Sequence, residues 1–111
     1  MKSGAYAAMS PSIRRSLSKL GADINVARRK RGLTIAHVAE AASVSIDSVR
    51  RLEGGDPTIS IGILAMVLLA LGEQGRLGKI IDVADDTTGL VLDEARLPKR
   101  VRVKKEEPRS L

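Results

Sequence analysis

The sequence contains no cysteine, phenylalanine or tryptophan, and its 111 residues include one tyrosine, Tyr6, and one histidine, His37. Without cysteine the chain can form no disulfide, thiol nucleophile or thiolate metal site. A core without Phe or Trp has to be built from Leu, Ile, Val, Ala and Met, which suits helices that pack on helices. Catalysis that depends on a metal or on histidine has almost nothing to work with, so we expect neither an enzyme nor a cofactor.

Long apolar runs are absent as well. No run reaches the roughly 18 residues that a membrane-spanning helix needs, and the first residues lack the pattern of a signal peptide. We therefore expect a cytoplasmic protein with no membrane contact. At this length the chain has room for one domain plus tails.

The net charge of +6 is unevenly distributed. Residues 1–15 carry three basic side chains and no acidic one, and residues 16–55 carry seven basic and four acidic side chains. Residues 56–95 carry two basic and seven acidic side chains, whereas residues 96–111 carry seven basic and two acidic ones. Basic regions on both sides of an acidic one favour a polyanionic partner. Many small basic proteins have no such partner, so the motifs have to decide.

The composition predicts three segments. Residues 1–15 are polar and read as a flexible arm, residues 16–84 as a helical domain, and residues 85–111 as a linker with a basic tail. Within the last segment, Leu90 to Leu92 could form either a short strand or a helical turn, and Val101 to Lys104 alternates like a short exposed strand.

Capping residues place the helices of the domain. The first helix runs from about Ser16 to the basic residues before Gly32, where a glycine stop is expected. Thr34, Ser45 and Ser60 are N-caps for three more helices, and a weaker fifth helix is expected over residues 76–84. These elements predict an all-α fold, a compact four- to five-helix bundle.

The second and third of these helices are short and joined by a tight turn. That is the helix-turn-helix arrangement, in which the second helix enters the major groove of DNA and the first lies across the backbone. Ala39 has to be small because the two helices cross near it, Val44 is buried by the turn, and Val49 and Leu52 point inward.

The stretch from Ile24 to Gly72 resembles the Cro/repressor-type (XRE) helix-turn-helix family. GLT, VAEAASVS, SVRRLEGG and PTISIGILAMVLLALG stand where that family has its motifs, and cap, alanine, turn and LEGG positions agree in spacing. The resemblance implies a lambda-repressor-like fold and sequence-specific binding to double-stranded DNA.

Three positions differ locally from common patterns. The turn position that is usually glycine in the family is Ser43, which would have to accept a positive φ. The usual glutamine after the cap is Ile35, which removes one phosphate contact. His37 stands where a capping glutamate is common, and we expect it to be exposed to solvent or near phosphate, with no metal.

By this resemblance, the outward residues of the third helix read the bases. Arg51 can bind the O6 and N7 atoms of guanine, Asp47 can accept from cytosine N4, and Ile46 can pack on a thymine methyl group. The alternative is a merely solvated helix face. The predicted base-reading residues are Ser45, Ile46, Asp47, Ser48, Arg50 and Arg51.

Other residues are expected at the phosphates. These are Arg28, Lys30, Arg31 and Thr34, together with the backbone at the helix N-termini. The resemblance also implies that Arg28 pairs with Glu53 while still reaching phosphate. The alternative is a frayed surface arginine.

A single helix-turn-helix reads only a few base pairs, so we expect a homodimer on a palindromic operator. Ile63, Met66 and Leu69 are apolar where a surface helix should be polar. Either another part of the chain covers them or they face a partner. Val101 and Val103 could also pair with their symmetry mates as a two-stranded ribbon.

The order of the later segments gives a narrower likeness. PTISIGILAMVLLALG, an acidic linker, GLVLDEARLPKRVR and a basic end are together similar to HipB-like antitoxins, which are encoded beside a HipA-type kinase toxin. This implies a repressor that acts on its own operon and captures the toxin. Two alternatives stay open: a repressor with no toxin, and a protein-interaction module with little DNA binding.

Overall fold

The structure is a computed structural model that describes residues 4–96; residues 1–3 and 97–111 lie outside the described part. All regular elements in residues 4–96 are helical. Within the same residues, no helix combines the length and the apolar character needed to cross a membrane. The contacts divide the chain into two units, with the boundary after Leu77.

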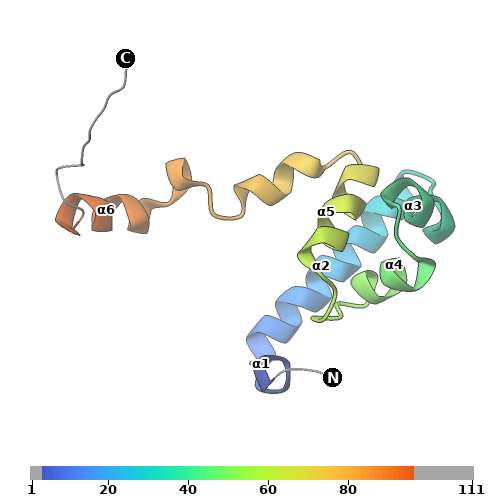
Figure 1. The fold of residues 1–111 in the computed structure, drawn as a ribbon, viewed down its shortest axis with the longest axis horizontal. Coiled ribbons are helices and arrows are strands. Elements are labelled where there is room, and N and C mark those ends of the chain that lie inside the picture. Colours follow the sequence, from blue (N-terminus) through green and yellow to red (C-terminus); the bar gives the residue numbers. More distant parts are fainter. Residues whose placement is uncertain (1–3, 97–111) are drawn as a thin grey trace, which may run out of the picture. The chain divides into compact units, whose positions relative to one another are not determined.

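The first unit contains five α-helices (Figure 1). They are α1 (Gly4–Ala7), α2 (Pro11–Lys30), α3 (Ile35–Ala42), α4 (Ile46–Glu53) and α5 (Ile61–Ala70). Within this unit α4 contacts α2, α3 and α5, and α3 also contacts α5. The predicted all-α fold is confirmed for the described residues.

The three predicted N-caps begin helices α3, α4 and α5. The side-chain oxygens of Thr34, Ser45 and Ser60 accept hydrogen bonds from the backbone N–H three residues later, at 3.0, 3.0 and 3.1 Å. Each bond satisfies a donor that the first helical turn leaves free. The helix starts are therefore encoded locally.

The start of α2 differs from the prediction. This helix begins at Pro11 rather than near Ser16, and Gly4–Ala7 forms the short helix α1, so the described part of the predicted flexible arm contains helical residues. Ser10 accepts a hydrogen bond from Ile13 N at 3.3 Å, and Pro11 occupies the first helical position, where its missing N–H costs nothing. The apolar residues that recur at three- and four-residue steps, Leu17, Leu20 and Ile24, begin only after Ser16, so their spacing does not reveal the first turns of the helix.

Three valines form the centre of the core, one from each of the helices packed around it. Val38 of α3, Val49 of α4 and Val67 of α5 are fully buried. Smaller and larger aliphatic side chains complete the buried cluster: Ile24, Ala39, Ala42, Leu52 and Leu71. As the composition predicted, this core contains no aromatic residue.

Helices α2 and α4 approach each other closely at Gly21. A Cβ atom there would lie 2.5 Å from the carbonyl oxygen of Glu53 and 2.6 Å from that of Leu52. No side chain fits in that space without moving the backbone. Gly21 therefore allows the C-terminal end of α4 to rest directly on α2.

The turn between α3 and α4 has the strained backbone expected at Ser43. Its φ of 58° and ψ of 39° are left-handed, and Ser43 is the only described non-glycine residue with positive φ. The next residue, Val44, donates its N–H to the carbonyl of Ala39 at 3.0 Å and packs against the core. The turn thus joins the two helices through three residues, as the sequence indicated.

The second unit is described up to Arg96. The 3₁₀ helix η1 (Gln74–Lys79) spans the boundary between the units, and η2 (Val83–Asp85) and α6 (Thr87–Arg96) follow. No residue of the unit's described part is buried, and Ile80, Ile81 and Val83 are largely exposed.

One prediction for this region was wrong, and of the two alternatives for Leu90 to Leu92 the helical one is confirmed. Instead of a fifth α-helix over residues 76–84, the chain forms the two 3₁₀ helices η1 and η2. Gly75 and Gly78 allow many other conformations. Asp82 caps η2 by accepting a hydrogen bond from Ala84 N. Leu90 to Leu92 lie inside α6, which Asp86 begins by accepting from Gly89 N at 2.9 Å. The strand predicted at Val101 to Lys104 lies outside the described residues.

Candidate nucleic-acid interface

Helix α4 has one buried and one exposed face. Val49 is fully buried and Leu52 is 6% exposed, so these two side chains fix the helix on the core. On the other side Ile46 is 43% exposed, and the side chains of Asp47 and Arg51 are 75% and 44% exposed. The same face presents Arg50 to solvent.

Ser45 and Ser48 are engaged with each other at the start of α4. Ser45 Oγ accepts from Ser48 N and donates to Ser48 Oγ at 2.9 Å. Both residues were predicted to read bases. Their first function in the structure is to begin the helix, while its N-terminal end remains exposed at Ser45 and Ile46.

Arg51 is held by the loop that follows α4. Its Nε donates to Asp56 Oδ2 at 2.8 Å and its Nη2 donates to Thr58 Oγ1 at 2.7 Å. Thr58 in turn donates its hydroxyl and its backbone N–H to Asp56 Oδ1, at 2.7 and 2.8 Å. Arg51, Asp56 and Thr58, which we call the Arg51 network, thus form a closed set of hydrogen bonds.

The Arg51 network has an electrostatic consequence for Asp56. The hydrogen bond from Arg51, followed by those from the Thr58 hydroxyl and backbone, holds the pKa of the Asp56 carboxyl well below its ordinary range. The same partner raises the pKa of Arg51. Both groups are therefore charged at neutral pH, and the guanidinium position is fixed by an ion pair.

Arg28 and Glu53 form the pair implied by the resemblance. Their side chains are 11% and 7% exposed, and Arg28 Nη1 also donates to the carbonyl of Leu33 at 2.9 Å. Asn25 Nδ2 donates to Glu53 Oε1 at 2.8 Å, which adds a partner that the sequence analysis missed. Since the guanidinium is nearly enclosed by these groups, the prediction that Arg28 also reaches phosphate is not supported by its position.

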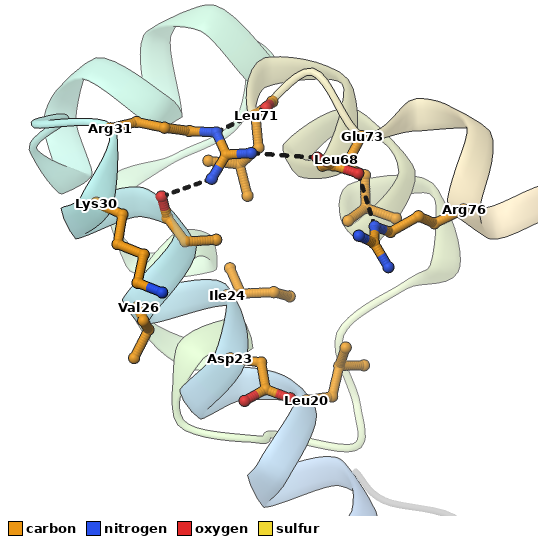
Figure 2. Close-up of a pocket in the computed structure, with 11 residues that line it drawn as sticks. Leu20, Asp23, Ile24, Val26, Lys30, Arg31, Leu68, Leu71, Glu73 and Arg76 are labelled. Atoms are coloured by element: carbon orange, nitrogen blue, oxygen red, sulfur yellow. Dashed lines mark hydrogen bonds and ion pairs between the residues drawn. The ribbon is translucent and has the colours of Figure 1, made fainter.

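Arg31, one of the predicted phosphate residues, turns toward the end of α5. Its Nε donates to the carbonyl of Leu71 at 3.0 Å, its Nη1 to that of Ala27 at 2.9 Å, and its Nη2 to Glu73 at 3.2 Å (Figure 2). The carbonyls at a helix C-terminus lack partners within the helix. Arg31 supplies one, and so ties the C-terminal end of α2 to that of α5.

A pocket of about 410 Å³ lies beside this contact. Figure 2 shows Ile24 and Leu20 of α2 in its wall, with Glu73 and Arg76 on the opposite side. The hydrogen bond from Arg76, with the charge of Arg31, lowers the pKa of Glu73. The lining is aliphatic with a charged rim, and it contains neither a histidine nor a hydroxyl nucleophile.

The remaining predicted phosphate residues lie at the surface. Lys30 is exposed at the last turn of α2, and Thr34 is exposed at the start of α3, where it caps the helix. His37 is exposed in the first turn of α3, as expected. Thr34, His37 and Arg50 thus give the exterior of α3 and α4 polar and basic groups, beside the exposed carboxylates of Glu40 and Asp47.

The predicted partner surface on α5 is partly exposed. Met66 and Leu69 are 37% and 49% exposed, whereas Ile63 packs against the core cluster. Ile61, at the start of the same helix, is 70% exposed and was not predicted. Val101 and Val103 lie outside the described residues.

Several contributing residues were not found from the sequence. Asn25 lies one helical turn before Arg28, a spacing that signals a shared helix face. Asp56 and Thr58 stand in the Gly-Gly-Asp-Pro-Thr turn, where an Asp that accepts from a backbone N–H two residues later is typical. Nothing in the sequence pattern distinguished Gly21 from any other helical glycine.

Neither a metal site nor a match to a known protein assigns a function to this region. Among the described residues, no group of three or more His, Cys, Asp or Glu side chains could hold a metal ion. The chain matches no protein-family model, no curated protein and no solved structure.

Proposed function

We propose that this protein is a DNA-binding transcriptional repressor that reads an operator with the exposed face of α4. Helices α3 and α4 act as a helix-turn-helix motif: α4 enters the major groove and α3 lies across the phosphate backbone. Ile46, Asp47, Arg50 and Arg51 meet the base edges.

One observation carries the proposal. The α4 face opposite Val49 and Leu52 exposes an apolar side chain, a carboxylate and two guanidinium groups on a helix of eight residues. A helix that served only the core would need no such combination. In the major groove, guanine offers two acceptors to a guanidinium group, cytosine offers a donor to a carboxylate, and thymine offers a methyl group to an aliphatic side chain.

The surroundings of α4 support phosphate binding. Lys30 and Thr34 are exposed, and the N-terminal turns of α3 and α4 carry backbone N–H groups that suit anions. Arg28 and Arg31 support the interface without contacting DNA. Arg28 binds Glu53 at the end of α4, and Arg31 binds the carbonyl of Leu71 at the end of α5.

The repressor functions as a homodimer on a palindromic operator. Each α4 contacts only a few base pairs, and two copies spaced by one turn of DNA supply the missing specificity. Met66 and Leu69 of α5, together with Ile61 at its start, are exposed apolar side chains that suit such a contact.

The proposal is tested by selecting bound duplexes from a randomised DNA library and measuring the affinity of the selected duplex by fluorescence anisotropy. A dimer with six or more phosphate contacts should lose about three orders of magnitude in affinity between 50 and 200 mM salt. Ile46→Ala and Arg50→Ala should weaken binding to the selected duplex much more than to an unrelated one.

Arg15→Ala is the matched control, because Arg15 is an exposed arginine of α2 outside the proposed reading face. It removes the same charge as Arg50→Ala and should change the affinity for both duplexes by the same factor. Selection of no common sequence by the wild-type protein would refute the repressor function.

A second candidate function is capture of a partner protein, as in HipB-like antitoxins that bind a HipA-type kinase toxin. It is favoured by the described part of the second unit, where six large apolar side chains are exposed and none is buried. These are Ile80, Ile81, Val83, Leu90, Val91 and Leu92. Such side chains are unfavourable in water unless a partner covers them.

The two candidates predict different results. Replacing Ile80 and Ile81 by Ser should leave the affinity for the selected duplex unchanged if these residues serve a partner protein. Co-expression with a kinase-like protein encoded next to this gene, followed by purification of the complex, tests capture directly. Recovery of the two proteins separately would remove this candidate.

A further inference from the structure

The guanidinium group of Arg51 is used on only one of its edges. Arginine has five N–H donors arranged in a plane, and two adjacent pairs can each make a bidentate contact. One pair is Nε with Nη2, and the other is Nη1 with Nη2. In the Arg51 network the first pair is occupied, with Asp56 at 2.8 Å and Thr58 at 2.7 Å.

The second edge remains available. Its nearest charged neighbour is Asp47, whose Oδ2 lies 3.8 Å from Nη1, a distance too long for a hydrogen bond. Asp47 stands one helical turn before Arg51 on the exposed face of α4. The free edge therefore lies on the side of the guanidinium that faces the proposed reading surface.

We propose that Asp56 and Thr58 are specificity-determining positioning residues, which hold the Nε/Nη2 edge of Arg51 so that its Nη1/Nη2 edge is presented to a guanine. This inference rests on the proposed function. Neither residue touches DNA in this arrangement. They act on base selection through the orientation of Arg51.

Guanine fits the free edge because its O6 and N7 atoms are two adjacent acceptors in the major groove. Adenine offers one acceptor and one donor on the same edge, so an arginine held in this orientation would make one bond and meet one N–H group. A freely rotating arginine can tilt away to a phosphate instead. Fixing the first edge removes that alternative and raises the preference for guanine.

The Thr58 hydroxyl is the most specific element of the arrangement. It accepts from Arg51 Nη2 while it donates to Asp56 Oδ1, so a single group connects the arginine and the carboxylate on both sides. Valine has the same shape as threonine without the hydroxyl, and serine keeps the hydroxyl without the methyl group. Thr58→Val and Thr58→Ser therefore separate the hydrogen bonds from the packing.

The experiment compares the sequences selected from a randomised duplex library by the wild type, Arg51→Ala, Thr58→Val and Thr58→Ser, together with their melting temperatures. Arg51→Ala identifies the position that Arg51 reads, where the wild type should prefer G by about tenfold to a hundredfold. Thr58→Val should lose most of that preference at the same position only. Thr58→Ser should keep it.

A positioning role and a structural role give different results. If Thr58→Val lowered the affinity for all duplexes equally and kept the G preference, the inference would be wrong. It would also be wrong if Arg51→Ala selected the wild-type sequence, although the repressor function would then still stand. No sequence preference in the wild type would contradict the proposed function itself.

Asp56→Asn provides a second variant should Thr58→Val fail to fold. Asparagine keeps an oxygen that can accept from Thr58 N and is common in such turns, but it lacks the charge that holds Arg51. A reduced G preference at the Arg51 position, with other positions unchanged, is the expected result. An unchanged preference would count against the inference.

Discussion

Arg28 and Glu53 join the last turn of α2 to the last residue of α4 through two hydrogen bonds, from Nε to Oε2 at 2.7 Å and from Nη2 to Oε1 at 3.2 Å. The hydrogen bond with Glu53, opposed by burial, raises the pKa of Arg28. The Arg28 guanidinium therefore stays charged, and its hydrogen bonds to Glu53 fix the C-terminal end of the proposed reading helix.

Glu53→Ala should lower the free energy of unfolding by about 3 kcal/mol, because it leaves the nearly buried Arg28 guanidinium without its carboxylate. Urea unfolding followed by circular dichroism measures this change. Asp23→Ala is the control, since the pair between Lys19 and Asp23 is exposed and should contribute less than about 1 kcal/mol. Equal losses for the two variants would contradict this account of the pair.

Gly21→Ala should destabilise the protein by about 1–3 kcal/mol, because the added methyl group would overlap the carbonyl groups of Leu52 and Glu53. Gly62→Ala is the matched control in α5, where a Cβ would meet only Ser60 Oγ at 3.8 Å. That change should stabilise the helix by about 0.5–1 kcal/mol. Thermal melting of the two variants should shift in opposite directions.

Ser43→Gly should stabilise the fold by about 1 kcal/mol, because glycine adopts the left-handed conformation of this turn without the cost that serine carries. The same substitution at Ser16, an exposed serine inside α2, should cost about 0.5–1 kcal/mol. Unfolding free energies from urea titration compare the two. A loss of stability in Ser43→Gly would mean that the serine side chain has an essential partner.

The Arg51 network predicts a dependence of stability on acidity. The folded-state pKa of Asp56 lies below its unfolded value near 3.8. The contribution of Asp56 to the free energy of unfolding is therefore fully present well above that pH and is lost as the pH falls below it. Asp56→Asn should be less stable than the wild type at pH 7. The difference should shrink between about pH 4 and pH 2, as measured by urea midpoints at each pH.

The helices of the first unit were largely predictable because their signals are local. Thr34, Ser45 and Ser60 each bond to a backbone N–H three residues away, and the apolar spacing of Val49 and Leu52 gives the buried face of α4 directly. The positive φ of Ser43 was implied by the resemblance to the Cro/repressor-type family, which usually has glycine at this turn position.

The start of α2 and the partners of two arginines were not predicted, for two physical reasons. Pro11 and Ser10 looked like an irregular arm because no apolar stripe covers the first turns of α2, although cap and proline suffice to begin it. The partners of Arg51 and Arg31 could not be inferred, since they come from Asp56, Thr58 and Leu71, and a side chain's choice among nearby acceptors depends on the folded backbone.

The three fully buried valines also bear on how α4 would meet DNA. A valine side chain has few rotamers, so Val38, Val49 and Val67 lock neighbouring helices together with little room for repacking. A change in the orientation of α4 on α3 and α5, as a groove of another width would require, would have to repack these side chains. Operators would then be discriminated by how readily their own base-pair steps deform, in addition to the bases that α4 contacts.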